Sequence, residues 1–320
     1  MLSAKRGRPE EHPRCAATLR QLRSLPIFAL CSVLGAASCS GSESPSDNGP
    51  WVQVAVGRGF ACALDEAGYA TCWGSVESPP QGELKSISAK ANHACAITSE
   101  NQIACWIGNE EFDDVGQAAP PAGDFTKVSA GEQHSCGLAI DSTIVCWGLD
   151  STDYGFGEGR VNDVPEGAFE SVAAGWGQSC AIGANGSIAC WGEGPEAESR
   201  AGSFSQVAVG PGMTCSIEED GSAECWGGWY NEDEGMAWAW EPDGAFIDID
   251  GGDDTCAIGS GGAIECHYGV EPWFDEAAPP DGTFADLAMG GGACAVGADG
   301  DIACWGSTPR NDGDAPEDRF

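Results

Sequence analysis

Short apolar stretches alternate with polar, glycine-rich segments along the chain from Trp51 onward. Most stretches open on an aromatic residue and run for four to six apolar or small residues before a glycine. Runs of this length that are bounded by glycine are typical of buried β-strands. The pattern predicts seven such strands, at Trp51 to Gly57, Leu84 to Ala89, Phe125 to Gly131, Phe169 to Gly175, Phe204 to Gly210, Phe246 to Gly251 and Phe284 to Gly290.

A cysteine frame follows each of these stretches, as in SCAIGANGSIACWG at Ser179 to Gly192. In every copy two cysteines ten residues apart flank a turn, and the frame recurs about every 40 residues. A fixed period of this length indicates a repeat array, here with three strands in each repeat. The seven pairs are Cys62 and Cys72, Cys95 and Cys105, Cys136 and Cys146, Cys180 and Cys190, Cys215 and Cys225, Cys256 and Cys266, and Cys294 and Cys304.

The turn inside each frame follows from the pairing of its cysteines. If Cys62 faces Cys72, then Asp65 faces Tyr69 and three loop residues remain. Such loops need a left-handed backbone at their third position, which glycine supplies and asparagine tolerates. Only Ser142 departs from this rule among the aligned residues Gly68, Asn101, Ser142, Gly186, Gly221, Gly262 and Gly300. The same count places each cysteine pair at a non-hydrogen-bonded site, where facing residues come closest.

Fourteen cysteines in this order suit either metal ligation or seven disulfides. Zinc sites use closely spaced pairs such as CxxC, and the chain contains none. The export signal described below favours disulfides. We therefore expect seven local disulfides, no metal centre and no cofactor.

Both faces of the predicted hairpins are apolar. In the fourth copy, one face carries Cys180, Ile182, Ile188 and Cys190, and the other carries Ala181, Ala189 and Trp191. A sheet that is apolar on both sides must lie between other sheets, here those of the neighbouring repeats. Tryptophan follows the second cysteine in six copies and is expected to fill the gaps between repeats, whereas His267 replaces it in the sixth.

The glycine-ended strand, the segment AGEQHSCGLA at Ala130 to Ala139 and the repeated Cys-Trp-Gly triplet resemble the repeats of the regulator of chromosome condensation family. The resemblance covers Trp51 to Phe320 and implies an all-β fold, a seven-bladed β-propeller with one blade for each cysteine frame. Paired cysteines and an export signal place the chain near a secreted bacterial lipoprotein branch, which includes a β-lactamase inhibitor protein. The tail Ala315 to Phe320 echoes Val164 to Phe169, which suggests that the ring closes by packing this end against the first blade.

The first 38 residues predict a signal peptide of the lipoprotein type. Six Lys or Arg residues precede an apolar run from Leu25 to Ala37, which at thirteen residues is too short to span a bilayer. Small residues directly before Cys39 resemble a lipobox, which implies cleavage there and lipid on the Cys39 thiol; an ordinary secretory signal is the alternative. Residues 39–50 are polar and rich in Ser, Gly and Pro, as in a flexible tether. We expect a monomer anchored at the outer membrane or cell surface, with 51–320 as the propeller.

The net charge of −36 excludes several classes of partner. Electrostatic repulsion makes nucleic acid and anionic lipid poor partners, so membrane attachment is expected only through the lipid anchor. The charge suits a basic partner. Exchange of nucleotide on a small GTPase, the role implied by the eukaryotic relatives, fits poorly with an exported chain.

No catalytic constellation emerges from the motifs. His93 and His134 occupy one repeat position where other copies carry Phe60, Gln178 or Met213, which favours a structural role. The densest acidic segment offers a calcium candidate, although its spacing matches no standard loop. The alternative is a group of solvated acids at the rim of the central channel, and the residues are Asp248, Asp250, Asp253 and Asp254.

The connectors after the Cys-Trp-Gly position are the better candidates for recognition, because long loops at one topological position carry function in such scaffolds. They run nine and eleven residues after the first and fourth repeats, but fifteen to twenty after the others. The fifth mixes aromatic and acidic residues, which suits a basic protein or a glycan; packing of its rings on its own blade is the alternative. The candidate binding residues are Trp229, Tyr230, Trp238, Trp240, Trp273, Phe274, Tyr154 and Phe156.

The leading hypothesis is therefore a lipid-anchored, disulfide-bonded β-propeller that binds a protein or glycan and catalyses no reaction. The alternative is a lyase or hydrolase that uses carboxylates in the channel, and clustered carboxylates with raised pKa would favour it.

Overall fold

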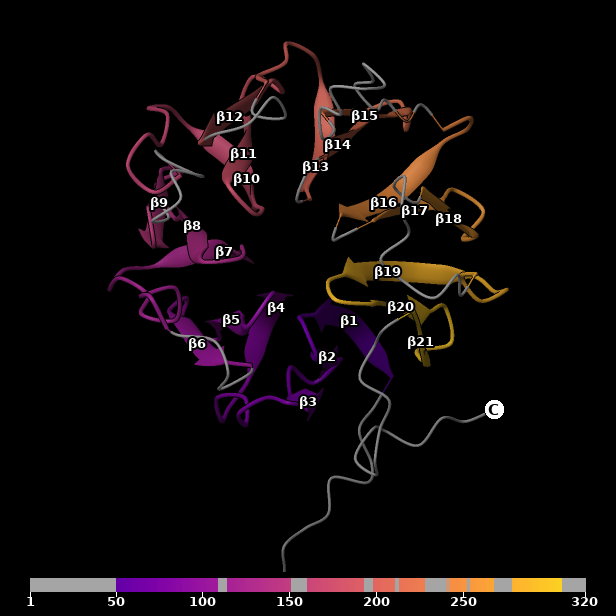
Figure 1. Cartoon of the computed structure of the whole chain (residues 1–320), viewed down its shortest axis with the longest axis horizontal. Coiled ribbons are helices and arrows are strands. Elements are labelled where there is room, and N and C mark those ends of the chain that lie inside the picture. Colours follow the sequence, from indigo (N-terminus) through magenta and orange to yellow (C-terminus); the bar gives the residue numbers. More distant parts are fainter. Residues whose placement is uncertain are drawn as a thin grey trace, which may run out of the picture. The chain divides into compact units, whose positions relative to one another are not determined.

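The chain folds into seven three-stranded antiparallel sheets that surround a common centre (Figure 1). The computed structural model describes residues 50–108, 114–150, 160–192, 198–210, 213–227, 240, 242–251, 254–267 and 278–306. Each sheet is one blade whose strands follow in chain order from the innermost to the outermost. The predicted all-β, seven-bladed propeller is confirmed.

The strands of each blade have the same lengths to within two residues. The innermost strands are β1 (Trp51–Val56), β4 (Leu84–Lys90), β7 (Phe125–Ala130), β10 (Phe169–Ala174), β13 (Phe204–Val209), β16 (Phe246–Gly251) and β19 (Phe284–Met289). The middle strands are β2 (Phe60–Asp65), β5 (His93–Thr98), β8 (His134–Ala139), β11 (Gln178–Gly183), β14 (Met213–Glu218), β17 (Thr255–Gly259) and β20 (Ala293–Gly297). The outer strands are β3 (Ala70–Gly74), β6 (Ile103–Ile107), β9 (Ile144–Gly148), β12 (Ile188–Gly192), β15 (Ala223–Gly227), β18 (Ile264–His267) and β21 (Ile302–Trp305).

The turn between the middle and outer strands has the predicted geometry in all seven blades. In the first blade, Asp65 N donates to Tyr69 O at 3.1 Å and Gly68 N donates to Asp65 O at 2.9 Å. The third loop residue is left-handed in every copy, with φ of 65° at Asn101 and 69° at Ser142. Ser142 therefore adopts the glycine conformation despite its side chain.

All seven predicted disulfides are present, and each joins the middle and outer strands of one blade. The Cα atoms of each pair lie 4.0 Å apart, as expected for non-hydrogen-bonded sites. The two faces of each blade are also as predicted. Cys180 and Ile182 pack against Phe204 and Trp226 of the next blade, whereas Trp191 packs on the preceding one.

The first and last blades close the ring with the bonds that join the other blades. In six junctions the backbone N–H that opens an inner strand donates to the left-handed turn residue of the preceding blade, as in Leu84 N to Gly68 O at 2.7 Å. Trp51 N donates to Gly300 O at 3.1 Å and makes the seventh junction equivalent. The tail Ala315 to Phe320, expected to close the ring, lies outside the described residues.

Within the part of the chain that the structure describes, no helix is long and apolar enough to cross a membrane.

Candidate functional site

Most candidate binding residues of the connectors lie outside the described residues. These are Tyr154, Phe156, Trp229, Tyr230, Trp238, Trp273 and Phe274, together with the lipidation candidate Cys39 and the calcium candidate Asp253.

Trp240 is the one connector aromatic of this set that the structure places, and it packs on the propeller. Its ring stacks on His267 with 5.7 Å between ring centroids and 12° between planes. The residue forms a β-bridge with Cys225 and joins the apolar cluster between the fifth and sixth blades. Because His267 replaces the usual tryptophan, Trp240 supplies the missing aromatic packing. Trp240 therefore packs on both the fifth and the sixth blades, whereas the alternative interpretation expected packing on its own blade alone.

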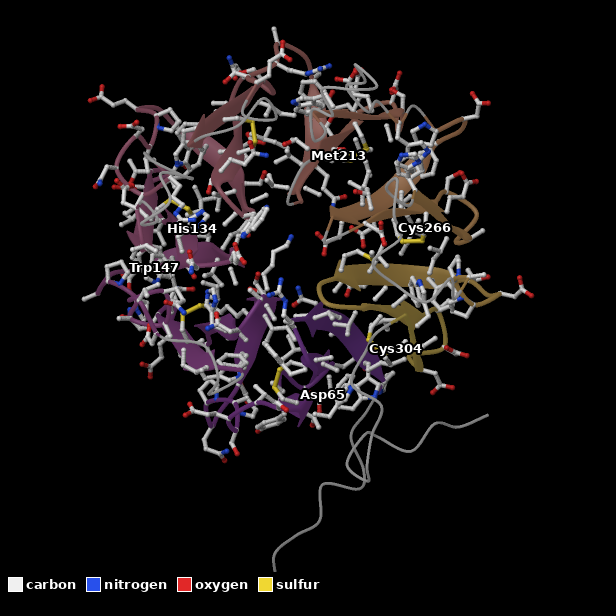
Figure 2. All side chains as sticks on the ribbon, in the orientation of Figure 1. Asp65, His134, Trp147, Met213, Cys266 and Cys304 are labelled. Carbon is white, nitrogen blue, oxygen red and sulfur yellow. A yellow bond between two sulfur atoms is a disulfide. The ribbon has the colours of Figure 1, made fainter. Side chains whose placement is uncertain are left out.

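His93 and His134 lie buried at the junctions between blades, with no exposed surface. His93 Nε2 lies 2.7 Å from Ser135 Oγ, and His134 Nε2 lies 2.7 Å from Ser179 Oγ. Figure 2 shows His134 near Trp147 in the third blade. Burial lowers the pKa of His93 to about 4 and that of His134 to about 3, so both rings are neutral at physiological pH.

A side-chain hydrogen bond at the same repeat position also joins the fourth and fifth blades. Gln178 Nε2 donates to Thr214 Oγ1 at 3.1 Å at the next junction. In the first blade the aligned residue is Phe60, and its neighbour in the second blade is Ala94, which has no hydroxyl. At these four junctions a polar residue faces a polar partner and an apolar residue faces an apolar one. The histidines belong to this structural series, as the sequence predicted.

Two long connectors also contribute to packing between blades. Gln117 and Arg160 are buried, and their carbonyl oxygens accept the indole N–H groups of Trp147 at 2.9 Å and Trp191 at 3.0 Å. The Arg160 guanidinium donates to Leu149 O at 2.6 Å, to Trp176 O at 3.0 Å and to Gln133 Oε1 at 3.5 Å. Part of the extra connector length therefore stabilises the ring.

The central channel is the candidate site that the described residues form. It is a cavity of about 540 Å³ lined by all seven inner strands. Lys90, the last residue of β4, extends across it and donates from Nζ to Val209 O at 2.9 Å and to Gly251 O. These carbonyl groups belong to the fifth and sixth blades, so Lys90 bridges the channel from the second blade.

Three carboxylates line the channel on the sixth and seventh blades. Asp248 Oδ2 accepts Leu287 N at 2.9 Å, and Asp250 Oδ2 accepts Met289 N at 2.8 Å. Asp286 Oδ2 accepts Val54 N at 2.7 Å and thereby joins the last blade to the first. Asp248 and Asp250 lie at the channel wall and are half-buried, because alternation along β16 turns both side chains toward the seventh blade, whose backbone amides they accept.

Enclosure in the channel raises the pKa of all three groups. Loss of hydration raises the pKa of Asp286 to about 8, and the charges of Asp248 and Asp250 add to this effect. Loss of hydration also raises the pKa of Asp248 to about 6 and that of Asp250, which the ammonium of Lys90 partly offsets. At neutral pH Asp286 is mostly protonated, whereas Asp248 is mostly ionised.

The calcium candidates do not converge on one point. Asp248 and Asp250 accept backbone amides of the seventh blade, while Asp254 is buried beside the start of β17. Among the described residues, no three His, Cys, Asp or Glu side chains are grouped so that they could hold a metal ion.

Lys90 and Asp286 were not among the residues predicted from the sequence. Asp286 occupies the third position of its inner strand, as does Asp248, so alignment of the repeats would have placed both in the channel. Lys90 is the seventh residue of a strand that has six in the other blades. The repeat pattern does not indicate that the Lys90 side chain extends across the channel.

Comparison with known proteins supports the fold. Residues 125–155 match the model of the regulator of chromosome condensation (RCC1) repeat. No curated protein sequence matches the chain. The CRINKLY WD40 ectodomain of the Arabidopsis thaliana receptor kinase ACR4 is similar with a TM-score of 0.63 at 24% identity, over 81% of this chain and 96% of that one.

Two further structures share the architecture. The ectodomain of the Physcomitrella patens receptor kinase CR4 gives a TM-score of 0.60 at 20% identity, over 81% of this chain and 75% of that one. Yeast RCC1 (Prp20), solved with Kap60, gives 0.53 at 14% identity, over 68% and 69%. With the seven equivalent blades, these similarities show that the chain is a seven-bladed β-propeller, in which residues 125–155 match the RCC1 repeat.

Proposed function

We propose that this chain is an exported, lipid-anchored interaction module that binds a protein partner and catalyses no reaction. The observation that carries the proposal is the burial of both His–Ser pairs, His93 with Ser135 and His134 with Ser179. These are the described groups whose chemistry most resembles a base and a nucleophile, yet all four residues have 0% exposure. A substrate has no access to them, so recognition at the surface is the better-supported function.

Export is supported by the disulfides. Seven of them in one propeller indicate an oxidising compartment, since the cytosol keeps thiols reduced. Attachment of lipid at Cys39 is tested by metabolic labelling with a fatty-acid probe and by membrane fractionation. The Cys39→Ser variant should lose both the label and membrane association. A variant that stays in the membrane fraction would remove the lipid anchor from the proposal.

The partner is proposed to be a basic protein that binds the long connectors, with a glycan as the other candidate. The net charge of −36 favours a basic ligand. Yeast RCC1, which shares the fold, has been solved in complex with a protein, Kap60. Within the fifth connector, Trp229, Tyr230 and Trp238 are the residues to test, because Trp240 packs on His267.

The test is capture of envelope proteins by the full chain in mild detergent. Changing Trp229, Tyr230 and Trp238 together to Ala should abolish capture of a specific protein if the fifth connector binds it. Changing Tyr69 and Ile140 to Ala is the matched control, because both are exposed apolar residues on hairpin turns, with 50% and 62% exposure. Equal capture by the connector variant would exclude this surface.

The raised pKa of Asp286 and Asp248 favours a second candidate, a channel hydrolase or lyase. A protonated and an ionised carboxyl in one cavity can serve as acid and base. This candidate predicts turnover of a small substrate that Asp248→Asn and Asp286→Asn both abolish, while capture of the protein partner is unchanged.

A further inference from the structure

Lys90 breaks the repeat pattern at one end of the channel. Counted from the start of its inner strand it is the seventh residue, and the other six copies have glycine at this position, namely Gly57, Gly131, Gly175, Gly210, Gly252 and Gly290. A Cβ added to Gly290 would lie 2.2 Å from Val56 O, and one added to Gly175 would lie 2.3 Å from Val209 Cγ1. Close packing of the blades explains glycine there, whereas the lysine of the second blade needs another explanation.

The backbone that presents Lys90 is strained. Ala91 follows it with φ of 46°, in the left-handed region that residues other than glycine rarely adopt. Lys90 pairs with His93, so β4 continues one residue further than the other inner strands before the chain turns. Strain of this kind persists where the surrounding contacts maintain it. The contacts of the Lys90 side chain therefore bear on why this blade departs from the repeat.

The Lys90 ammonium is bound on the far side of the ring. Its Nζ donates to Val209 O at 2.9 Å and to Gly251 O, and these two residues end the inner strands β13 and β16. Burial raises the pKa of Asp250, and the charge of Lys90 partly offsets this rise, so the ammonium also interacts with that carboxyl. Protein oxygens of the fifth and sixth blades thus take the place of water around the ammonium.

These contacts join blades that are not neighbours in the ring. They lie at the end of the channel where the inner strands finish and the connectors leave, because each inner strand starts beside a hairpin turn of the preceding blade, as in Leu84 N to Gly68 O. The other side-chain hydrogen bonds between blades of the described residues join neighbours, as Asp286 does with Val54. Lys90 instead connects the second blade to the fifth and sixth.

We infer that Lys90 is a strap across the connector end of the channel, which ties the second blade to the fifth and sixth and limits how far the ring can open. Contacts between neighbours hold a repeat array together, so small shifts at successive junctions add up around the ring. A bond across the channel opposes this sum directly. The inference concerns the ring alone, so it rests neither on the proposed partner nor on a ligand of the channel.

The test is hydrogen exchange, measured by mass spectrometry on the full chain with its disulfides intact, in wild type and Lys90→Met. Methionine removes the ammonium and keeps most of the apolar side chain. Backbone amides of Phe204–Val209 and Phe246–Gly251 should exchange about fivefold faster or more in the variant, since exchange reports local opening. Amides of Phe169–Ala174, in a blade that the Lys90 ammonium does not contact, should stay within about twofold.

Lys85→Met is the matched control. Lys85 is exposed near the start of the same strand, and its Nζ donates to Asn101 Oδ1 at 2.5 Å within its own blade. The control therefore removes the same charge but no bond across the channel. Exchange in Phe204–Val209 and Phe246–Gly251 should remain within about twofold of wild type.

A second variant and a second measurement apply if Lys90→Met does not fold. Lys90→Gly restores the residue of the other six copies and should give the same faster exchange in the fifth and sixth blades. In wild type, trace acylation with acetic anhydride should modify Lys90 about tenfold or more slowly than the exposed Lys85 and Lys127, because the Lys90 ammonium is hydrogen-bonded. Unchanged exchange in the fifth and sixth blades, an equal increase in the fourth blade, an equal effect of Lys85→Met, or equal acylation of Lys90 and Lys127 would each overturn the inference.

Discussion

Replacing Asp286 with asparagine should remove a loss of stability that the wild-type chain shows above neutral pH. Asp286 has a pKa of about 8 in the folded chain, whereas an unfolded aspartate has a pKa of about 3.9. The folded state therefore holds the proton more tightly. Its contribution to stability is complete below the unfolded pKa and is lost as pH rises through about 8.

The magnitude follows from the two pKa values. Between pH 6.5 and pH 9 the folded chain loses about 2 kcal/mol through Asp286 alone, at 1.36 kcal/mol per pKa unit. Asp248, with a pKa of about 6, loses most of its contribution at lower pH. Because burial also raises the pKa of Asp250, the difference between wild type and Asp286→Asn in this window isolates the contribution of Asp286. Asparagine keeps an oxygen that can accept Val54 N, so the junction between the last and first blades is retained.

The assay is urea unfolding with the disulfides intact, followed by circular dichroism at several pH values in this window. The free energy of unfolding of wild type should fall by about 2 kcal/mol more than that of Asp286→Asn. Asp301→Asn, exposed in the same blade, should follow wild type. If the Asp286→Asn variant shows the same decline as wild type, the proton is not held at Asp286 and the reasoning about the channel fails.

Three further predictions concern the blades themselves. His134→Gln should keep the bond to Ser179, as Gln178 does with Thr214. Wild type should lose about 2–3 kcal/mol more unfolding free energy than this variant as pH falls from about 6.5 to 4.5, because buried His134 stays neutral until pH is near 3. Similar acid midpoints for the two proteins in urea unfolding would contradict this. Ser142→Gly should raise the free energy of unfolding by about 0.5–1 kcal/mol, since φ is 69° at this turn. Gly300→Ala should lower it by more, because the added Cβ would lie 2.4 Å from Pro50 Cβ at the junction of the last and first blades. Thermal melts measure both changes, and a stabilised Gly300→Ala would refute the geometry. Thiol titration in denaturant without reductant should detect no repeat cysteine, and prior reduction should lower the melting temperature; several reactive thiols from the repeats would exclude the seven disulfides.

The fold was predictable because its rules are local and are repeated seven times. The spacing of Cys62 and Cys72 determines the pairing of their strands, and that pairing determines which loop residue is left-handed. At Ser142 the residue type opposes this conformation, but the side chain of Asp141 accepts Thr143 N at 3.1 Å and Thr143 Oγ1 at 2.6 Å and supports the turn. A repeated frame thus overrides an unfavourable residue at one position.

The channel was not predictable in the same way, because its residues meet only when the ring closes. Asp286 and Val54 are 232 positions apart, and Lys90 reaches carbonyl groups 119 and 161 positions away. Parity along a strand indicates which side chains face the channel, but it does not indicate how far a lysine extends across it. Trp240 shows the same limit, since only the packed structure pairs it with His267.

The channel carboxylates Asp248 and Asp286 reduce the stability of the folded chain. Asp248 and Asp286 lower the stability of the folded chain wherever burial opposes their ionisation, and neutral acceptors at the same positions would not. Gln53 and Ser88 show that this propeller uses such acceptors elsewhere. Residues that reduce stability where a neutral alternative is available are characteristic of functional sites. Closure of the ring through Asp286 therefore has an electrostatic cost that the neutral acceptors Gln53 and Ser88 avoid at other junctions.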